Sequence, residues 1–208
     1  IAAECLYEGA LTVVDAKAAS VIVLAALPSP EAAARVTLVQ GLPKADKLEM
    51  IVQKATELGA WDVLPVETAR SVARMGDREA GKRERWNRIA LEAAKQSGRA
   101  HVPEIRPVCR LADAVEWLKA QGYDAVFVAW EMEGELRLGA AMSRMLAGTP
   151  QPRSVALVVG PEGGITPAEI ERLTAIGAQC VTLGRRILRT ETAGLCALTV
   201  VMSALGEM

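Results

Sequence analysis

The distribution of apolar positions along the chain changes near residue 30. Residues 11–27, "LTVVDAKAASVIVLAAL", are mostly apolar and often β-branched, and they predict one or two strands with no helix. Residues 28–34, "PSPEAAA", combine two prolines with small side chains and predict a linker. Beyond the linker, strand and helix patterns alternate. We therefore expect two domains, 1–30 and 31–208.

The second domain shows the pattern of an α/β fold. Predicted strands cover 35–42, 61–66, 124–130, 154–160 and 179–184, and predicted helices cover 45–58, 82–98, 111–122, 167–177 and 191–205. The strands are continuous aliphatic runs, which are typical of a parallel sheet covered by helices on both faces. The last helix is apolar nearly all round, which predicts burial, in the core or at an oligomer interface.

Composition agrees with a globular protein. Of the 208 residues, 51% are hydrophobic and 24% are charged, which excludes a disordered chain. No apolar run approaches the roughly 20 residues that a membrane span needs, so no membrane partner is expected. The first residue is Ile1 rather than Met, and we expect that a preceding segment is missing from this sequence.

Cysteine and histidine usage limits the possible chemistry. Cys5, Cys109, Cys180 and Cys196 are far apart and form no CxxC pair. This spacing argues against zinc and favours reduced thiols, so we expect core cysteines in a cytoplasmic protein. His101 is the single histidine, so a multi-histidine metal site is excluded and a Ser-His-Asp triad would depend on it alone. No metal is predicted.

Positive charge is concentrated in one part of the chain. The net charge is −1, but residues 70–110 hold 11 Lys or Arg and 5 Asp or Glu, a net of +6. Such a run forms either a solvated, salt-bridged helix face or a surface that binds a polyanion. Charge alone leaves both interpretations open.

Three loops follow the carboxyl ends of predicted strands, where open parallel sheets bind their ligands. They are "WEMEGE" (130–135), "GPEGGITP" (160–167) and "LGRRILRTETAG" (183–194). The second loop lacks the Lys-Ser/Thr of a P-loop and the spacing of GxGxxG. Its acidic Glu162 suits a cationic or hydroxyl-rich ligand, and its glycines let the backbone approach a heterocycle. The alternative is a tight strand–helix turn.

The flanks of these loops carry helix-start signals. Thr166 and Glu169 form a capping box, with Pro167 in the first turn. In the third loop, arginines are available to anions, and Ile187 and Leu188 form an apolar wall. The alternative there is a helix cap at Thr190 with solvated arginines.

Five segments carry a family resemblance: "LVQGLPKADKLEMIVQKATELG", "ETARSV", "RWNRIALEAAKQSGRAHVPEI", "LVVGPEGGITPAEI" and "VTLGRRILRTETAGLCALTVV". Together they closely resemble the SPOUT superfamily of RNA methyltransferases and, within it, the RsmE family of 16S rRNA (uracil-N3)-methyltransferases. The resemblance covers about residues 35–205.

The resemblance implies an α/β fold with a SPOUT-type knotted parallel sheet, whose C-terminal chain forms a trefoil knot. It also implies bound S-adenosylmethionine, a homodimer, and an N-terminal PUA-like β-barrel of which residues 1–30 would be the remnant. The implied substrate is a uridine (position 1498) of 16S rRNA in the small ribosomal subunit. No DNA partner is implied.

Site residues follow from the same resemblance, position by position. The cofactor pocket would be lined by Gly160, Glu162, Gly163, Gly164, Leu183, Gly184, Ile187 and Leu188. Methyl transfer to N3 requires loss of a proton, and we expect Arg189 to stabilise the charge on the uracil oxygens. Glu191 is a candidate base, or a helix N-terminal residue favoured by the helix dipole.

RNA contacts are expected mostly through phosphates. The predicted residues, each with solvated charge as the alternative, are Lys44, Lys47, Arg70, Arg74, Arg83, Arg88, Gln96 and Arg99. Ala69 and Lys95 depart from the family pattern, which has acidic residues there, so these contacts are less secure than the cofactor site.

Three other functions stay open. A SPOUT enzyme acting on another rRNA or tRNA site, such as a ribose 2′-hydroxyl, would share these motifs. A nucleotide-binding α/β enzyme of another kind is the second alternative. A non-catalytic RNA-binding assembly factor is the third, although the intact loop motifs argue against it.

Overall fold

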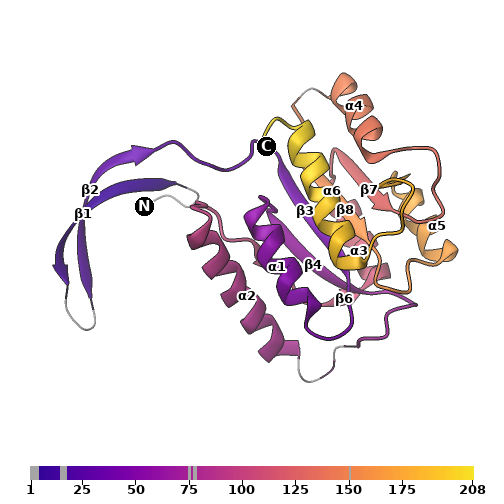
Figure 1. Ribbon diagram of the computed structural model, residues 1–208, viewed down its shortest axis with the longest axis horizontal. Helices are drawn as coiled ribbons and strands as arrows, with labels where there is room; N and C mark the ends of the chain where they lie inside the picture. The colour runs from indigo at the N-terminus through magenta and orange to yellow at the C-terminus, as the bar shows by residue number, and fades with distance from the viewer. Residues whose placement is uncertain (1–4, 15–17, 75, 77–78, 150) are drawn as a thin grey trace.

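A computed structural model describes residues 5–14, 18–74, 76, 79–149 and 151–208 (Figure 1). Its N-terminal part is a hairpin of β1 (Leu6–Val14) and β2 (Ala19–Leu27), which pair antiparallel and project away from the rest of the protein. The prediction of strands without a helix before residue 30 is confirmed for the described residues of this segment.

The remainder contains one parallel sheet. Its strands are β3 (Arg35–Gly41), β4 (Asp62–Glu67), β5 (Glu104–Ile105), β6 (Cys109–Arg110), β7 (Ala125–Ala129), β8 (Ser154–Val159) and β9 (Gln179–Val181). Their order is β5-β4-β3-β8-β7-β9, with β6 also paired to β4, and every pairing is parallel. The carboxyl ends of these strands therefore share one edge of the sheet, as predicted.

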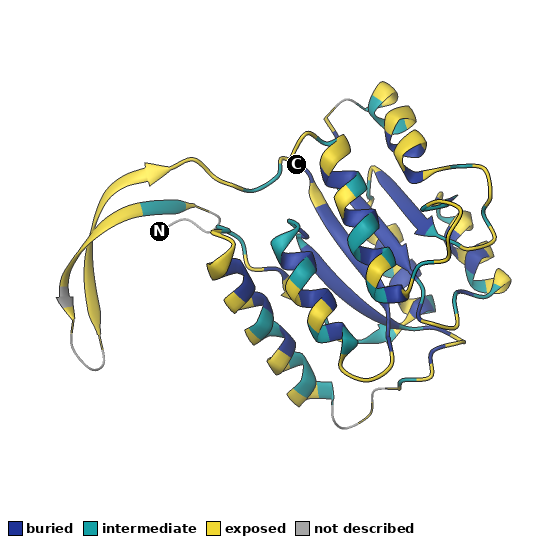
Figure 2. Cartoon of the chain, in the orientation of Figure 1, coloured by how far each residue is buried: buried dark blue, intermediate teal, exposed yellow. Residues whose placement is uncertain are grey.

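Helices cover both faces. On one face lie α1 (Lys47–Glu57), α2 (Glu79–Gln96), α4 (Leu138–Gly148) and α6 (Thr190–Ala204), and on the other lie α3 (Leu111–Gln121) and α5 (Pro167–Ala175). Side chains of β8 alternate between the two faces. Val155 and Leu157 join the hydrophobic core under α1, α2, α4 and α6, which we call the first core. Ala156 and Val158 join the second core, under α3 and α5. The sheet is accordingly the most deeply buried layer (Figure 2).

One helix was not predicted. In α4, Leu138, Ala141 and Met142 are buried at helical spacing against the first core. The sequence carries this periodic signal directly after the loop at 130–135. The two-residue strands β5 and β6 were also missed, because strands this short carry no periodicity.

The last helix is only partly buried within this chain, so burial of its other side at an oligomer interface stays a prediction. Gly194, Ala197 and Val201 are buried, whereas Thr192 and Thr199 are exposed. Apolar residues surround much of the helix, but only one side packs on the sheet. No helix in the described part of the chain is long and apolar enough to cross a membrane.

The cysteines are less buried than expected. Cys5 is exposed, and Cys109, Cys180 and Cys196 are half-buried free thiols. Burial, with smaller contributions from Asp113 and Glu79, raises the pKa of Cys109 to about 11. Its thiol therefore stays protonated near neutral pH and is a poor nucleophile.

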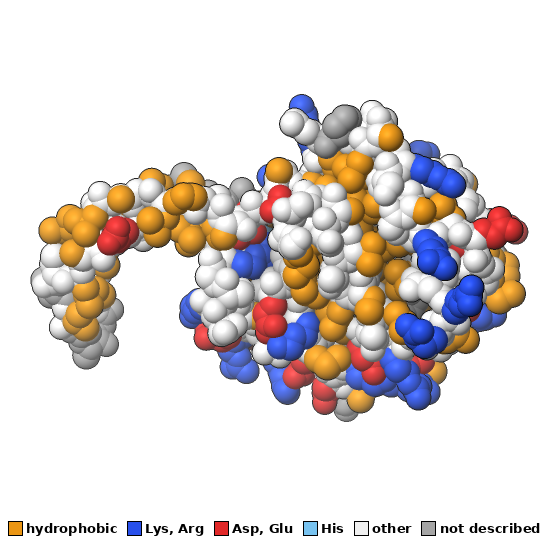
Figure 3. Space-filling view, turned by 45° about the horizontal axis from the view of Figure 1, so that its top comes forward, with side chains coloured by type: hydrophobic (Ala, Val, Ile, Leu, Met, Phe, Trp, Pro, Cys, Tyr) orange, Lys and Arg blue, Asp and Glu red, His pale blue; other side chains and the backbone are white. Residues whose placement is uncertain are grey.

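The hairpin exposes apolar side chains on both of its faces. All nine residues of β2 are exposed, and large hydrophobic side chains are accessible at Leu11, Val14, Val21, Ile22, Val23, Leu24 and Leu27. Figure 3 shows hydrophobic side chains along the projecting arm. A two-stranded ribbon is only marginally stable by itself, and apolar surface of this kind marks a site of further contact.

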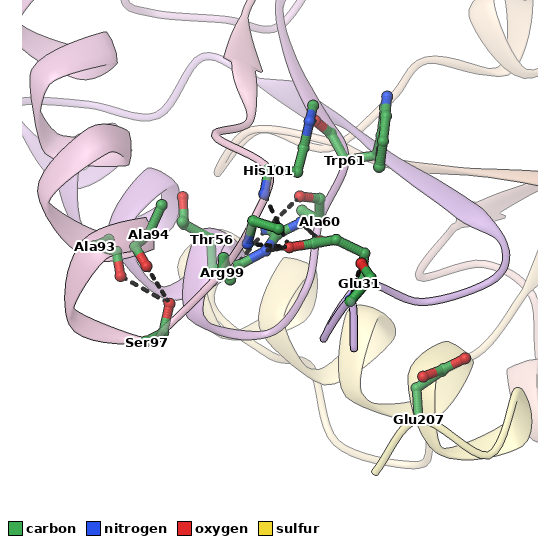
Figure 4. Close-up of polar contacts among 12 residues, drawn as sticks. Glu31, Thr56, Ala60, Trp61, Ala93, Ala94, Ser97, Arg99, His101 and Glu207 are labelled. Carbon is green, nitrogen blue, oxygen red and sulfur yellow. Dashed lines mark hydrogen bonds and ion pairs between the residues drawn. The ribbon is translucent and has the colours of Figure 1, made fainter. Parts of the chain in front are cut away.

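The predicted linker is held firmly by one acidic residue. Glu31 accepts hydrogen bonds from the guanidinium of Arg99 (Nη2–Oε2 2.6 Å) and from the backbone N–H groups of Ala100 and His101 (Figure 4). Arg99 also donates to the carbonyls of Thr56 and Ala60. The side chains of Glu31 and Arg99 are 9% and 6% exposed.

These contacts change the interpretation of Arg99. Its guanidinium was predicted to contact RNA, but it is buried and bonded to the linker and to the end of α1. The buried guanidinium already donates to the Glu31 carboxylate and to two backbone carbonyls, so it is poorly placed to bind a phosphate. The structure therefore gives Arg99 a structural role.

The buried pair predicts acid-sensitive stability. Burial opposes ionisation of Glu31, but hydrogen bonds from Arg99 and the two backbone groups outweigh it and lower its pKa below 4.5. Because the pKa is lower in the folded state, the pair stabilises the protein above the unfolded-state pKa. This stabilisation is lost as the pH falls through the folded-state pKa.

We expect Glu31→Gln to lower the free energy of unfolding by about 3–5 kcal/mol at pH 7, because Arg99 is left buried and unpaired. The difference from wild type should shrink as the pH falls below the unfolded-state value, as measured by urea denaturation across pH 3–7. Glu116→Gln, at an exposed position of α3, is the control. A constant difference across this range would contradict the assignment.

Candidate functional site

A cavity of about 1010 Å³ lies at the carboxyl edge of the sheet, between the three loops identified in the sequence. We call it the three-loop cavity. All eight residues predicted for the cofactor pocket line it, and so does Arg189. Glu191, the candidate base, is not among its lining residues. Parallel pairing of β7, β8 and β9 brings these loops together, although they span residues 129–193 of the chain.

A buried hydrogen-bond chain holds the second and third loops together. Thr190 donates its hydroxyl to the carbonyl of Gly160 (2.6 Å), and Gln40 Nε2 donates to the Thr190 hydroxyl (2.8 Å). Gln40 also donates to the carbonyl of Gly41 (3.0 Å). Thr190 is therefore not the N-cap of the last helix, although one interpretation of the sequence placed the cap there. Arg189 occupies the N-cap position, with no side-chain cap.

Gln40 is completely buried, and its Oε1 atom has no hydrogen-bond partner among the described residues. A Cβ atom added to Gly194 would lie 3.0 Å from this oxygen. Glycine at this position in α6 therefore leaves the space that the Gln40 side chain fills. The start of α6 is fixed to β3 through this amide and to the end of β8 through the Thr190 hydroxyl.

The second of the three loops, which we call the GPEGG loop, has a backbone that other groups can approach closely. Gly164 adopts a φ of +72°, which favours glycine, and Gly41 at the end of β3 packs directly against Pro161. The predicted capping box of Thr166 and Glu169 is present. The loop thus ends β8 and starts α5 within a few residues.

The capping glutamate has a second role. Glu169 Oε1 accepts a hydrogen bond from the backbone N–H of Ala69 (2.8 Å), and Arg70 Nη1 donates to the carbonyl of Gly163 (3.2 Å). These contacts hold the loop after β4 against the GPEGG loop. Arg70, predicted to contact RNA, therefore lies directly beside the three-loop cavity.

Glu162 is held by the loop before α1. Its carboxylate accepts from the backbone N–H of Lys44 (3.1 Å to Oε1) and from Lys47 Nζ (3.1 Å), and Lys47 also contacts Glu191 Oε2 (3.2 Å). Burial opposes ionisation, but the backbone donors and Lys47 prevail and lower the pKa of Glu162. The bonds to Glu162, and next those to Glu191, raise the pKa of Lys47.

The loop after β7, the first of the three loops, contributes more residues to the cavity than the sequence indicated. Residues 129–131, 133–135 and 137 line it, including three glutamates. Glu133 accepts hydrogen bonds from the backbone N–H groups of Glu135 (2.8 Å) and Leu136 (3.0 Å), which lower its pKa. The position of this loop after a strand is the signal in the sequence, and it does not distinguish among the residues of the loop.

Unpaired arginines surround the cavity. Arg137, Arg185, Arg186 and Arg189 are exposed lining residues, and their guanidinium groups form no hydrogen bond or ion pair within the described part of the chain. The space-filling view shows Lys and Arg side chains around the right-hand half of the α/β domain (Figure 3). Four unpaired cations beside a cavity favour a polyanionic partner.

The apolar residues of the third loop are not equivalent. Leu183 packs against the first core and Leu188 is half-buried, so both present apolar surface to the cavity. Ile187 is 88% exposed and lies at the rim. Ile187 therefore does not form part of an apolar wall in this conformation, as the sequence had predicted it would.

The predicted RNA-binding residues separate into groups. Lys44, Lys47 and Arg70 lie near the GPEGG loop, and Arg74 pairs with Glu67 (3.2 Å). Arg83 donates to the carbonyl of Ile105 (3.1 Å) and is half-buried. Much of the basic surplus of residues 70–110 is thus used internally.

The remaining two, Arg88 and Gln96, line a groove between α1 and α2. This groove also contains four carboxylates, from Asp46, Glu49, Glu57 and Glu92. The groove also contains Lys54 and Arg88, so its lining carries more negative than positive charges and offers no cationic surplus to a phosphate. The structure therefore favours the rim of the three-loop cavity, rather than α2, as the surface for a polyanion.

Comparison with known proteins identifies the class. Residues 30–202 match the family model of the RNA methyltransferase domain. The fold alone is shared with a SpoU methyltransferase from Streptomyces viridochromogenes, with a TM-score of 0.53 at 14% identity over 89% of this chain and 67% of that one. The chain thus contains an RNA methyltransferase domain.

Similarity at the sequence level is more specific. The chain is 45% identical over 168 residues to the ribosomal RNA small subunit methyltransferase E of Bacillus subtilis, covering 80% of this chain and 65% of that protein. The enzyme of the same name from Neisseria gonorrhoeae, solved bound to S-adenosyl methionine, superposes with a TM-score of 0.79 at 28% identity, over 97% of this chain and 79% of that one. The chain belongs to the ribosomal RNA small subunit methyltransferase E family and spans slightly less than two thirds of its Bacillus relative.

The hydrogen-bond chain through Thr190 generates a stability prediction. Thr190→Val keeps the shape of the side chain but removes both the donor to Gly160 and the acceptor for Gln40. We expect the free energy of unfolding to fall by about 1–3 kcal/mol, as measured by urea denaturation. Thr192→Val, at an exposed position two residues on, is the matched control. Equal effects of the two substitutions would contradict the role of Thr190.

Proposed function

We propose that this protein methylates RNA of the small ribosomal subunit, with S-adenosylmethionine as the methyl donor and N3 of a uracil in 16S rRNA as the acceptor. The observation that carries the proposal is the three-loop cavity, with bare glycine backbone on one side and unpaired arginines at its rim. The names of the relatives supply the reaction class and the ribosomal substrate.

The residues of the cavity fit the donor. A volume of about 1010 Å³ is at the upper end of small-molecule sites. Leu183 and Leu188 offer apolar surface to an adenine ring, and the backbone around Gly160 and Gly164 offers N–H and C=O groups to its edge. When bound, S-adenosylmethionine would supply an electrophilic methyl group on its sulfonium.

Arg189 is the residue best placed to act on the acceptor. Its guanidinium is unpaired within the described residues, lines the cavity and stands at the N-terminus of α6. It would stabilise the negative charge that develops on the uracil oxygens as the N3 proton leaves. The cavity would also orient the acceptor, which supplies further rate.

Glu191 suits its alternative role, that of an acidic residue at a helix N-terminus. Its carboxylate contacts Lys47, lies in the first turn of α6 and is not a lining residue of the cavity. We therefore favour a structural role at the helix N-terminus, where a negative charge is stabilised.

The rim arginines and Arg70 extend the cavity into a surface for the RNA backbone. Arg185 and Arg186 were not among the residues chosen for RNA binding, yet they are unpaired in the described structure and lie next to Arg189. Phosphate contacts by such residues fix the position of the RNA but do not read its sequence.

The family resemblance supports four further parts of the proposal. We propose that the last strands and helix form the trefoil knot, that the hairpin belongs to a PUA-like barrel, and that the protein is a cytoplasmic homodimer. The apolar faces of the hairpin support contact with a further sheet. Half-buried Leu195 and Val200 on α6 support a second helix layer from the partner.

Two measurements test the proposed function. Isothermal titration should show one S-adenosylmethionine bound per chain, and no binding would favour an assembly factor without methyltransferase activity. Mass mapping of 16S rRNA from cells lacking the protein should show loss of one uridine N3 methyl group. Loss of a ribose 2′-O-methyl group instead would assign the reaction to a different acceptor.

Arg189→Ala should reduce methyl transfer about 100- to 1000-fold, because the charge on the acceptor is no longer stabilised, and should leave donor affinity within about twofold. Single-turnover transfer and titration calorimetry measure the two quantities. Arg144→Ala, at an exposed position of α4 outside the cavity, is the control. Near-normal transfer by the Arg189 variant would show that another group carries this role.

A further inference from the structure

We infer that Glu131 binds the ribose hydroxyl groups of the methyl donor. The inference concerns the same cavity and rests on the proposed donor. It begins from the four glutamates that line the cavity and from the hydrogen bonds that each already makes.

Two of these carboxylates are already used by the protein. Glu162 accepts from Lys44 and Lys47, and Glu133 accepts from two backbone N–H groups of its own loop. Glu131 and Glu135 form no side-chain hydrogen bond or ion pair with any other described residue. The acid expected from the sequence to meet the ligand, Glu162, is therefore not the one that is free.

Glu131 is also the one placed against the glycine loop. A Cβ atom added to Gly164 would collide with its Oε1 atom, so the carboxylate rests directly on the glycine backbone. The loop after β7 and the loop after β8 meet at this contact. An acceptor group therefore lies at this junction, on the wall of the cavity, and no donor among the described residues bonds to it.

The chemistry of the donor decides what this carboxylate contacts. A carboxylate beside the sulfonium would stabilise a positive charge that disappears as the methyl group leaves, and would therefore slow the transfer. Vicinal hydroxyl groups keep their charge and geometry throughout the reaction. Acidic side chains accept hydrogen bonds from ribose hydroxyls in other nucleotide sites, and the two oxygens of Glu131 can each accept one.

Calorimetric binding of S-adenosylmethionine and S-adenosylhomocysteine tests this contact. For Glu131→Gln we expect the Kd of both compounds to rise by a similar factor, about 10- to 100-fold, because hydrogen bonds to a charged acceptor are lost. A 2′,3′-dideoxy analogue of S-adenosylhomocysteine should bind wild type and variant equally. Glu171→Gln, exposed on α5 away from the cavity, removes the same charge and should change neither Kd.

Three other outcomes would overturn the inference. Weaker binding of S-adenosylmethionine alone would mean that Glu131 contacts the sulfonium, and unchanged Kd values would mean that it contacts neither group; both overturn the inference. If wild type binds neither compound, the proposed function fails as well. The thermal unfolding midpoint of Glu131→Gln should match that of wild type, because the side chain makes no hydrogen bond or ion pair within the described structure.

Discussion

The hydroxyl of Thr190 is the contact on which the arrangement of the site depends. It joins the first turn of α6 to the end of β8, through Gly160, and to the end of β3, through Gln40. Buried polar groups must find partners, so this hydroxyl and the Gln40 amide allow few positions for the helix. The loop before α6 then has to pass beside the GPEGG loop. The three-loop cavity is the space left between them.

A second constraint is the use of charge. Most acidic side chains near the site are bonded internally, as Glu162, Glu133 and Glu169 show. Basic side chains divide differently: Arg99 is buried in the linker contact, whereas Arg189 and its neighbours in the rim have no partner within the described part of the chain. Net charge near zero is therefore compatible with a cationic rim, because pairing neutralises the rest of the surface.

The same pairing explains which site predictions needed revision. Helix α2 is rich in basic residues, but several of them have partners within the protein: Arg85 pairs with Glu49 of α1, Lys95 pairs with Glu92, and Arg83 donates to the carbonyl of Ile105. Linear sequence shows a surplus of positive charge there and cannot show the acids that lie opposite. Conversely, Glu131 is an ordinary acidic residue in the sequence, and only its contact with Gly164 singles it out.

The sequence by itself determined the parallel α/β architecture, the strand ends that carry the site, and the capping box at Thr166. These features follow from apolar periodicity and local hydrogen bonding, which depend on neighbouring residues. It did not determine which side of α6 is buried, the role of Thr190, or which glutamate and which arginines are free. Those properties depend on contacts between segments as far apart as Gln40 and Thr190. Only the tertiary structure decides them, because partners distant in the chain compete for the same polar groups.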